Sequence, residues 1–185
     1  MQAEVFSVCL FCGAKPGLDP FFRELARRTG RAIAERGWRL VYGGGGLGLM
    51  GAAADAALEA GGEVVGVIPE GMLAREQGHR SLSRLEVVPD MAVRKTRMIA
   101  LSDGFIALPG GLGTLDELFE VLTLRQTRYI DKPIALLNAR GYFDRLIAMC
   151  EGFVEAGFVA PADLAAMMHD DDLERLLQRL GPVRA

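Results

Sequence analysis

Short β-branched segments alternate with longer segments of helical periodicity along this 185-residue chain. Such alternation is typical of a parallel sheet covered by helices on both faces, because parallel neighbouring strands are joined by crossover helices. We therefore expect an α/β fold that is Rossmann-like and doubly wound, with a mainly parallel sheet. Two or three helices are expected after the last strand. The predicted strands span residues 5–11, 39–42, 63–68, 85–88, 104–108 and 133–137.

The segments between these strands carry helix start signals. Asp19 precedes a proline and Asp90 precedes an apolar-periodic stretch, so both are expected N-caps. Thr114 is expected to open a helix that runs to about residue 129. Residues 69–84 are instead irregular and polar, and a stretch of that length is more often a binding loop than a passive connection.

Length and composition limit the classes of protein to consider. A chain of this length is expected to form one domain, residues 1–185. The chain has 21 Lys plus Arg against 24 Asp plus Glu, a formal charge of −3. It therefore lacks the excess of positive charge that is typical of proteins that bind nucleic acid or an anionic membrane nonspecifically. The amino-terminal apolar run indicates a strand rather than a signal peptide, and no run is long enough to cross a bilayer. Three cysteines fit a reducing compartment, so we expect a cytoplasmic protein with a small-molecule partner.

A run of glycines at residues 43–51 (GGGGLGLMG) lies between a predicted strand and a predicted helix. It contains one G-x-G-x-x-G match, a pattern in which glycine lets the backbone approach a phosphate at a helix N-terminus. A dinucleotide site uses the first strand-to-helix turn, whereas this is the second. We interpret the loop, with Gly44, Gly45 and Gly48, as a phosphate cradle. The alternative is a tight turn that needs glycine for its positive φ.

A second glycine-rich loop, residues 109–114 (PGGLGT), also lies between a strand and a helix. Its residues Gly110, Gly111 and Gly113 would leave backbone amides open to an anion, and the Thr114 hydroxyl can cap the helix while facing that anion. In an open parallel sheet both loops lie at the carboxyl edge, where ligands bind at the switch in strand order. Together the two loops predict a nucleotide-sized crevice.

Glu117 lies three residues after Thr114, and this spacing has two interpretations. In a capping box, Glu117 would reach back to the amide of the helix cap. At the mouth of a phosphate loop, the same carboxylate could accept a proton from water or a hydrogen bond from ribose hydroxyls. Spacing alone leaves both interpretations open.

Arg94 and Lys95 lie one turn into the helix that follows Asp90. They form either a solvated basic pair, with Arg94 spaced for an i,i+4 contact to Asp90, or a functional pair. Met91 and Met98 flank them at helical spacing, so one of the two cations is expected to border the core.

Other chemistries find no support in the sequence. Cys9 and Cys12 form a C-x-x-C pattern, but residues three apart on a strand face opposite sides. His79 and His169 are isolated, without the spacing of a metal site, and G-x-S-x-G is absent. We expect no metal, no cofactor and no acyl-enzyme chemistry.

Three motifs together resemble one family. Residues 43–51 read GGGGLGLMG, residues 91–98 read MAVRKTRM and residues 109–117 read PGGLGTLDE, and an Arg-Lys pair upstream of PGGxGTxxE is specific to this superfamily. The chain resembles the LONELY GUY family of cytokinin riboside 5′-monophosphate phosphoribohydrolases, from the first strand to the strand after Lys132. The resemblance implies a hydrolase that cleaves the N-glycosidic bond of nucleoside 5′-monophosphates such as AMP, giving free base and ribose 5-phosphate without a cofactor.

The resemblance also implies site residues. Arg94 and Glu117 fall at the family's catalytic pair. One departure is that Ala14 and Lys15 stand where the family carries two serines, although Lys15 could still meet a phosphate. The positions expected to contact substrate are Glu76, Met91, Lys95, Thr123 and, in the two loops, Gly44, Gly45, Gly48, Gly110, Gly111, Gly113 and Thr114.

The implied chemistry suits these residues. Cleavage of a glycosidic bond passes through a ribose with oxocarbenium character. Glu117 would stabilise that cation and orient or deprotonate water, while Arg94 would bind substrate and hold the reacting end in register. The alternatives are a non-catalytic nucleotide or molybdenum-cofactor carrier on the same fold, and an NAD-dependent oxidoreductase, for whose catalytic domain the chain leaves no room.

A homodimer is expected as well. The helix from Thr114 is apolar around most of its circumference, which is common at a subunit contact. Burial under the C-terminal helices is the alternative, and family resemblance favours the dimer. The apolar residues of this helix are Leu115, Leu118, Phe119, Val121, Leu122 and Leu124.

Overall fold

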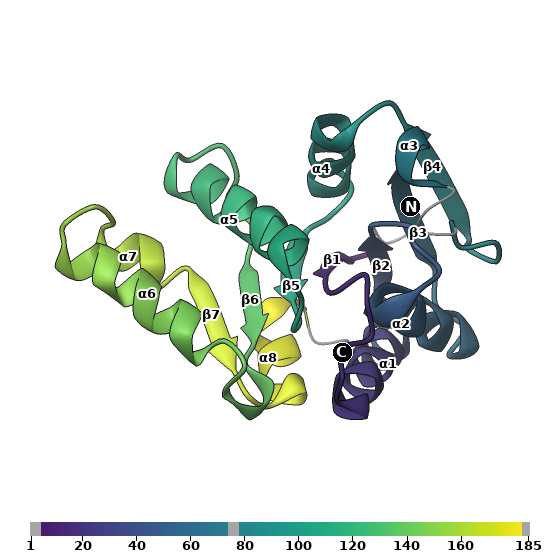
Figure 1. Cartoon of the computed structure of the whole chain (residues 1–185), viewed down its shortest axis with the longest axis horizontal. Helices are drawn as coiled ribbons and strands as arrows, with labels where there is room; N and C mark the ends of the chain where they lie inside the picture. Colours follow the sequence, from purple (N-terminus) through teal and green to yellow (C-terminus); the bar gives the residue numbers. More distant parts are fainter. Residues whose placement is uncertain (1–4, 74–77, 183–185) are drawn as a thin grey trace.

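The computed structural model describes residues 5–73 and 78–182. They form a seven-stranded sheet in the order β4-β3-β2-β1-β5-β6-β7 (Figure 1). Every pair of neighbouring strands in it is parallel, which confirms the predicted Rossmann-like α/β fold. The strands are β1 (Ser7–Phe11), β2 (Arg39–Tyr42), β3 (Val64–Pro69), β4 (Arg84–Val88), β5 (Gly104–Ala107), β6 (Ile134–Leu137) and β7 (Met167–Asp170).

Helices pack on both faces of this sheet, and each face has its own apolar cluster. One cluster joins the sheet to α1 (Pro20–Glu35), α2 (Gly48–Glu59) and α8 (Leu173–Leu180). The other joins it to α4 (Met91–Ala100), α5 (Leu112–Gln126), α6 (Asp144–Glu155) and α7 (Pro161–Leu164). No helix in the described ranges is long and apolar enough to span a bilayer.

Alternation along β1 shows how the central strand serves both clusters. Val8 and Leu10 belong to the cluster under α1 and α2, whereas Cys9 belongs to the cluster under α4 and α5. Cys12, just past the strand, falls in the first cluster. The prediction that Cys9 and Cys12 face opposite sides of the sheet is therefore confirmed.

The expected helix caps are confirmed at two positions and wrong at the third. Asp19 accepts a 2.8 Å hydrogen bond from the amide of Phe21, and Asp90 accepts one of 2.9 Å from Val93. Helix α5, however, begins at Leu112 with Gly111 as N-cap, two residues before Thr114. Glycine is itself an acceptable N-cap, so the helix starts earlier than the hydroxyl pattern indicates.

Two short elements differ from the sequence prediction. Strand β7 (MMHD) was not expected, since it lacks β-branched residues and is defined by its parallel pairing with β6 at the sheet edge. The stretch predicted to be irregular starts with one helical turn, α3 (Glu70–Leu73), and Gly78 then forms an antiparallel bridge with Gly45.

The order of the strands determines where a ligand site can form at the edge of the sheet. The chain runs outward from β1 through β2 and β3 to β4, then returns to β5 on the other side of β1. The loops after β1 and β5 therefore lie side by side at the switch point, where ligands bind in open α/β sheets. A hydrogen bond of 3.3 Å from the amide of Gly13 to the carbonyl oxygen of Pro109 joins them.

Candidate active site

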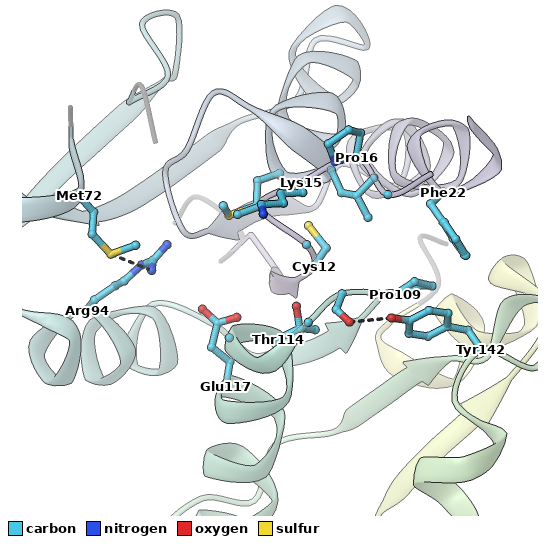
Figure 2. A pocket seen from close by; sticks show the side chains of 18 of the residues that line it. Cys12, Lys15, Pro16, Phe22, Met72, Arg94, Pro109, Thr114, Glu117 and Tyr142 are labelled. Atoms are coloured by element: carbon cyan, nitrogen blue, oxygen red, sulfur yellow. Dashed lines mark hydrogen bonds between the residues drawn. The ribbon is translucent and has the colours of Figure 1, made fainter. Parts of the chain in front are cut away.

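A cavity of about 530 Å³ opens at this switch point (Figure 2). Its volume suits a small-molecule ligand. The loop after β1 and the start of α1 contribute Cys12, Gly13, Ala14, Lys15, Pro16, Gly17 and Phe22, and α2, α3 and α4 contribute Leu49, Met50, Met72, Met91 and Arg94. The remaining wall is made by Pro109, Gly110, Gly111, Gly113, Thr114, Glu117 and Tyr142.

The amino terminus of α5 forms one wall of the cavity. Its N-cap, Gly111, provides no side-chain hydrogen bond, and the first helical amide bond to this residue comes from Leu115 at 3.1 Å. The amides of the first turn thus have no acceptor within the helix, and the helix dipole adds partial positive charge there. Gly113 and the buried Thr114 from this turn line the cavity, so the wall favours an anion.

Gly110 lies where no larger residue fits. A Cβ on Gly110 would lie 2.0 Å from Oγ1 of Thr114 and 2.9 Å from the amide nitrogen of Gly13. The close packing of the β5 loop against α5 and the β1 loop therefore requires glycine at this position.

Arg94 is buried, with 4% of its surface exposed. Its Nη2 donates a 2.7 Å hydrogen bond to the carbonyl oxygen of Gly43, and its Nε donates one of 3.1 Å to that of Val67. Nη1 contacts Sδ of Met91 at 3.5 Å. The solvated-pair interpretation is thus wrong for Arg94, and the expectation that one cation borders the core is confirmed.

Gly43 is a residue that sequence reasoning did not single out. A Cβ on Gly43 would lie 2.0 Å from Nη2 of Arg94. The glycine run therefore includes a position that makes room for a guanidinium rather than for a phosphate. The available signal was only its place at the start of the run, directly after β2.

Lys95 does not line the main cavity. Its ammonium group pairs with Asp116 at 3.1 Å and with Glu120, both on α5. The hydrogen bond to Glu120, followed by that to Asp116, raises the pKa of Lys95. Lys95 also borders a much smaller cavity together with Glu117, whereas it is not among the residues that line the main cavity.

Glu117 lies in the second turn of α5 and lines the main cavity. Since the helix begins at Leu112 with Gly111 as N-cap, the capping-box interpretation, in which Thr114 is the N-cap, is wrong. Figure 2 shows the Glu117 carboxylate pointing into the cavity, toward the guanidinium of Arg94. Burial and, second, the charge of Glu117 raise the pKa of the Cys12 thiol, so Cys12 is not a thiolate nucleophile at neutral pH.

The glycines of the first loop serve packing rather than the cavity wall. Gly44 and Gly48 have φ of +77° and +64°, and a Cβ on Gly48 would lie 2.2 Å from the carbonyl oxygen of Ala14. Neither residue lines the cavity, nor does Gly45, which pairs with Gly78. The tight-turn alternative therefore fits Gly44 and Gly48, while Leu49 and Met50, from the same stretch of chain, line the cavity.

Of the other residues predicted to contact substrate, some line the cavity and some do not. Met91, Gly110, Gly111, Gly113 and Thr114 line the cavity together with Arg94 and Glu117. Thr123 is exposed on α5, outside the cavity lining. Glu76 lies outside the described residues. Across residues 5–73 and 78–182, no group of three or more His, Cys, Asp and Glu could hold a metal ion.

Two further residues reach the cavity. Lys15, at the departure from the family motif, lines it and forms no ion pair within the described part of the chain. Tyr142 was missed, because it follows β6 and no local motif connects it with the loops after β1 and β5.

These features define a Rossmann-like α/β protein with a candidate small-molecule site, a cavity at the switch point of its sheet. Residues 50–180 match the family described as possible lysine decarboxylase. A Rhodococcoides fascians protein named cytokinin riboside 5′-monophosphate phosphoribohydrolase is 48% identical over 169 residues, which cover 91% of this chain and 85% of that protein. The chain belongs to the LONELY GUY family, as its motifs predict.

Other similar proteins differ in length or are more distant. A rice (Oryza sativa subsp. japonica) protein named probable cytokinin riboside 5′-monophosphate phosphoribohydrolase is 48% identical over 154 residues. The match covers 83% of this chain but only 63% of the rice protein's length. The molybdenum cofactor binding protein of Rippkaea orientalis has a TM-score of 0.71 at 21% identity, covering 96% of each chain, and shows the shared fold.

Proposed function

We propose that this chain is an enzyme that hydrolyses the N-glycosidic bond of cytokinin riboside 5′-monophosphates to free base and ribose 5-phosphate. The observation that carries the proposal is the placement of two groups on one helix. The first-turn amides of α5 and the Glu117 carboxylate face the same cavity about one helical turn (~5 Å) apart. That arrangement presents an anion site and a carboxylate to the two ends of a ribose 5-phosphate unit.

The phosphate end of the substrate lies at the amino terminus of α5 in this scheme. The backbone N–H groups of the first turn of α5 donate hydrogen bonds to the 5′-phosphate, and the Thr114 hydroxyl donates another. Lys15 supplies the neutralising cation, since Arg94 commits two nitrogen atoms to the carbonyl groups of Gly43 and Val67. Monophosphates are therefore preferred over nucleosides.

The reacting end then lies beside Glu117. The bond between C1′ and the base nitrogen breaks, its electron pair leaves with the base, and the ribose acquires oxocarbenium character. The Glu117 carboxylate stabilises this cation and takes a proton from the water that attacks C1′. The departing base takes a proton from solvent and Glu117 gives its proton back to solvent, so one water is consumed for each base and ribose 5-phosphate released.

Arg94 acts as the fixed partner of Glu117. Its hydrogen bonds to two backbone carbonyl groups hold the guanidinium at the cavity wall, on the side toward which Glu117 points (Figure 2). A guanidinium held in this way keeps the reacting end of the substrate in register.

The rest of the cavity suits an apolar base. Besides Lys15, Arg94 and Glu117, the cavity is lined by large side chains without charge, including Phe22, Leu49, Met50, Met72 and Met91. These residues favour a prenylated adenine over plain adenine, because an alkyl substituent buries apolar surface there. A non-catalytic cofactor carrier is less well supported, since the likeness to such proteins concerns the fold alone.

The functional form in this proposal is a cytoplasmic homodimer. Leu118 and Val121 of α5 are buried, but Leu115, Phe119 and Leu122 remain half-buried on the same helix. A second copy would cover this apolar surface. Since Thr123 lies outside the cavity, its substrate contact requires that second copy. The three cysteines are free, which suits a reducing compartment.

Chromatography of free base tests the proposal. The protein is incubated with isopentenyladenosine monophosphate, AMP and isopentenyladenosine, and we expect base release from the prenylated monophosphate and at least tenfold less from the nucleoside. Glu117→Gln should reduce turnover at least 100-fold, because the carboxylate that meets the cation is removed. Glu24→Gln, an exposed change on α1, is the matched control. Unchanged turnover in folded Glu117→Gln protein would contradict the mechanism.

A further inference from the structure

Tyr142 joins two walls of the cavity although it belongs to neither glycine-rich loop. Its hydroxyl donates a 2.8 Å hydrogen bond to the carbonyl oxygen of Gly110, drawn as a dashed line in Figure 2. Its ring packs edge-on against Phe22 of α1, with centroids 5.5 Å apart. One side chain thus contacts both the loop after β5 and the helix after β1.

The backbone before Tyr142 is held in a conformation that its neighbours maintain. Arg140, in the turn η1 (Ala139–Gly141), has φ of +55°, a left-handed value that costs a residue other than glycine energy. Its guanidinium donates a 2.9 Å hydrogen bond to Asp19 and lies 3.7 Å from the ring centroid of Phe21. Strained backbone is retained where surrounding contacts over-determine it, and here it delivers Tyr142 to the cavity.

The hydrogen bond from Tyr142 sets the orientation of one peptide group. The peptide between Gly110 and Gly111 is trans, so the N–H of Gly111 points opposite to the carbonyl group that Tyr142 holds. Gly111 is the N-cap of α5 and lines the cavity. Two consecutive glycines leave this peptide free to rotate unless something outside the loop fixes it.

We infer that Tyr142 is a positioning residue of the phosphate site. Its hydroxyl holds the Gly110–Gly111 peptide so that the N–H of Gly111 joins the first-turn amides of α5 in binding the 5′-phosphate. The inference rests on the proposed function for the nature of the ligand. Because the contact is at the phosphate end, its loss weakens binding of phosphorylated ligands and leaves the bond-breaking groups in place.

The test is Tyr142→Phe, which removes the hydroxyl and keeps the ring against Phe22. Calorimetric titration with ribose 5-phosphate should show affinity reduced about five- to tenfold, the effect of one net hydrogen bond. KM for isopentenyladenosine monophosphate should rise by a similar factor, with kcat within about twofold of the unmodified value. Tyr129→Phe is the matched control, since that residue is 81% exposed beyond the end of α5.

The outcomes separate this inference from the proposed function. If the unmodified protein does not bind ribose 5-phosphate, both are overturned. If it binds and Tyr142→Phe binds equally within twofold, only the role of Tyr142 is overturned. A variant with a lowered melting temperature and an equal loss of kcat for all substrates would show a structural role instead, which also overturns the inference.

Discussion

Gly43→Ala should lower the activity of the protein although Gly43 lies outside the cavity. Gly43 does not line the cavity, yet a Cβ there would lie 2.0 Å from Nη2 and 3.0 Å from Cζ of Arg94. The guanidinium must retreat by about 1 Å or more to restore an ordinary contact, and a displacement of that size can cost about 100-fold in rate. Gly43 has no positive φ, so the backbone itself accepts alanine.

The stability cost follows from the same contact. The 2.7 Å hydrogen bond from Arg94 to the Gly43 carbonyl oxygen is charge-assisted and buried, so its loss should lower the free energy of unfolding by about 1–3 kcal/mol. The assays are urea unfolding and kcat/KM for base release. We expect kcat/KM to fall about 100-fold while the protein stays folded.

Two controls test whether Gly43→Ala lowers kcat/KM by displacing Arg94. Gly152→Ala, in α6, meets nothing within 4 Å and should leave activity unchanged. Adding Gly43→Ala to Arg94→Ala should cause little further loss of activity, because residues that act through one contact are not additive. Unchanged kcat/KM in Gly43→Ala, or full additivity in the double variant, would refute the reasoning.

Three further changes test separate parts of the account. Lys15→Met should weaken ribose 5-phosphate binding about tenfold and flatten its salt dependence, measured by calorimetry; equal salt dependence would refute the role of Lys15. The hydrogen bond from Arg97 lowers the pKa of Glu86, so this pair stabilises the fold fully above the unfolded pKa of Glu86 and less as pH falls through the folded value. In urea unfolding, Glu86→Gln should therefore lose up to about 1 kcal/mol at pH 7, and its difference from the unmodified protein should shrink as the pH is lowered below the ordinary range of a glutamate pKa. Cys12 should react with iodoacetamide at least tenfold more slowly in the folded protein than in urea, as followed by mass spectrometry, because burial raises its pKa.

The fold could be predicted because its signals are local. Each central strand is a short apolar run between turn residues, and Asp19 and Asp90 cap their helices as their side chains indicate. Strand β7 has no such signal, since its pairing with β6 defines it. The start of α5 was misplaced because a glycine N-cap leaves no hydroxyl or carboxylate to mark it.

The site could be predicted only in part, because only some of its residues belong to local sequence motifs. Arg94 and Glu117 belong to motifs, and the structure brings both to the cavity. The contact between Arg94 and Gly43 spans 51 residues and arises from strand order, which no motif encodes. Tyr142 likewise reaches Gly110 only because β6 lies beside β5. Residues brought together by topology alone need the structure to be recognised.

The most direct test is a crystal structure of the Glu117→Gln variant with isopentenyladenosine monophosphate bound. We predict the phosphate within hydrogen-bonding distance of the amide nitrogens of Gly113 and Thr114, with C1′ facing the side chain at position 117. A phosphate bound away from the α5 amino terminus, or C1′ turned toward solvent, would contradict the proposed catalytic arrangement.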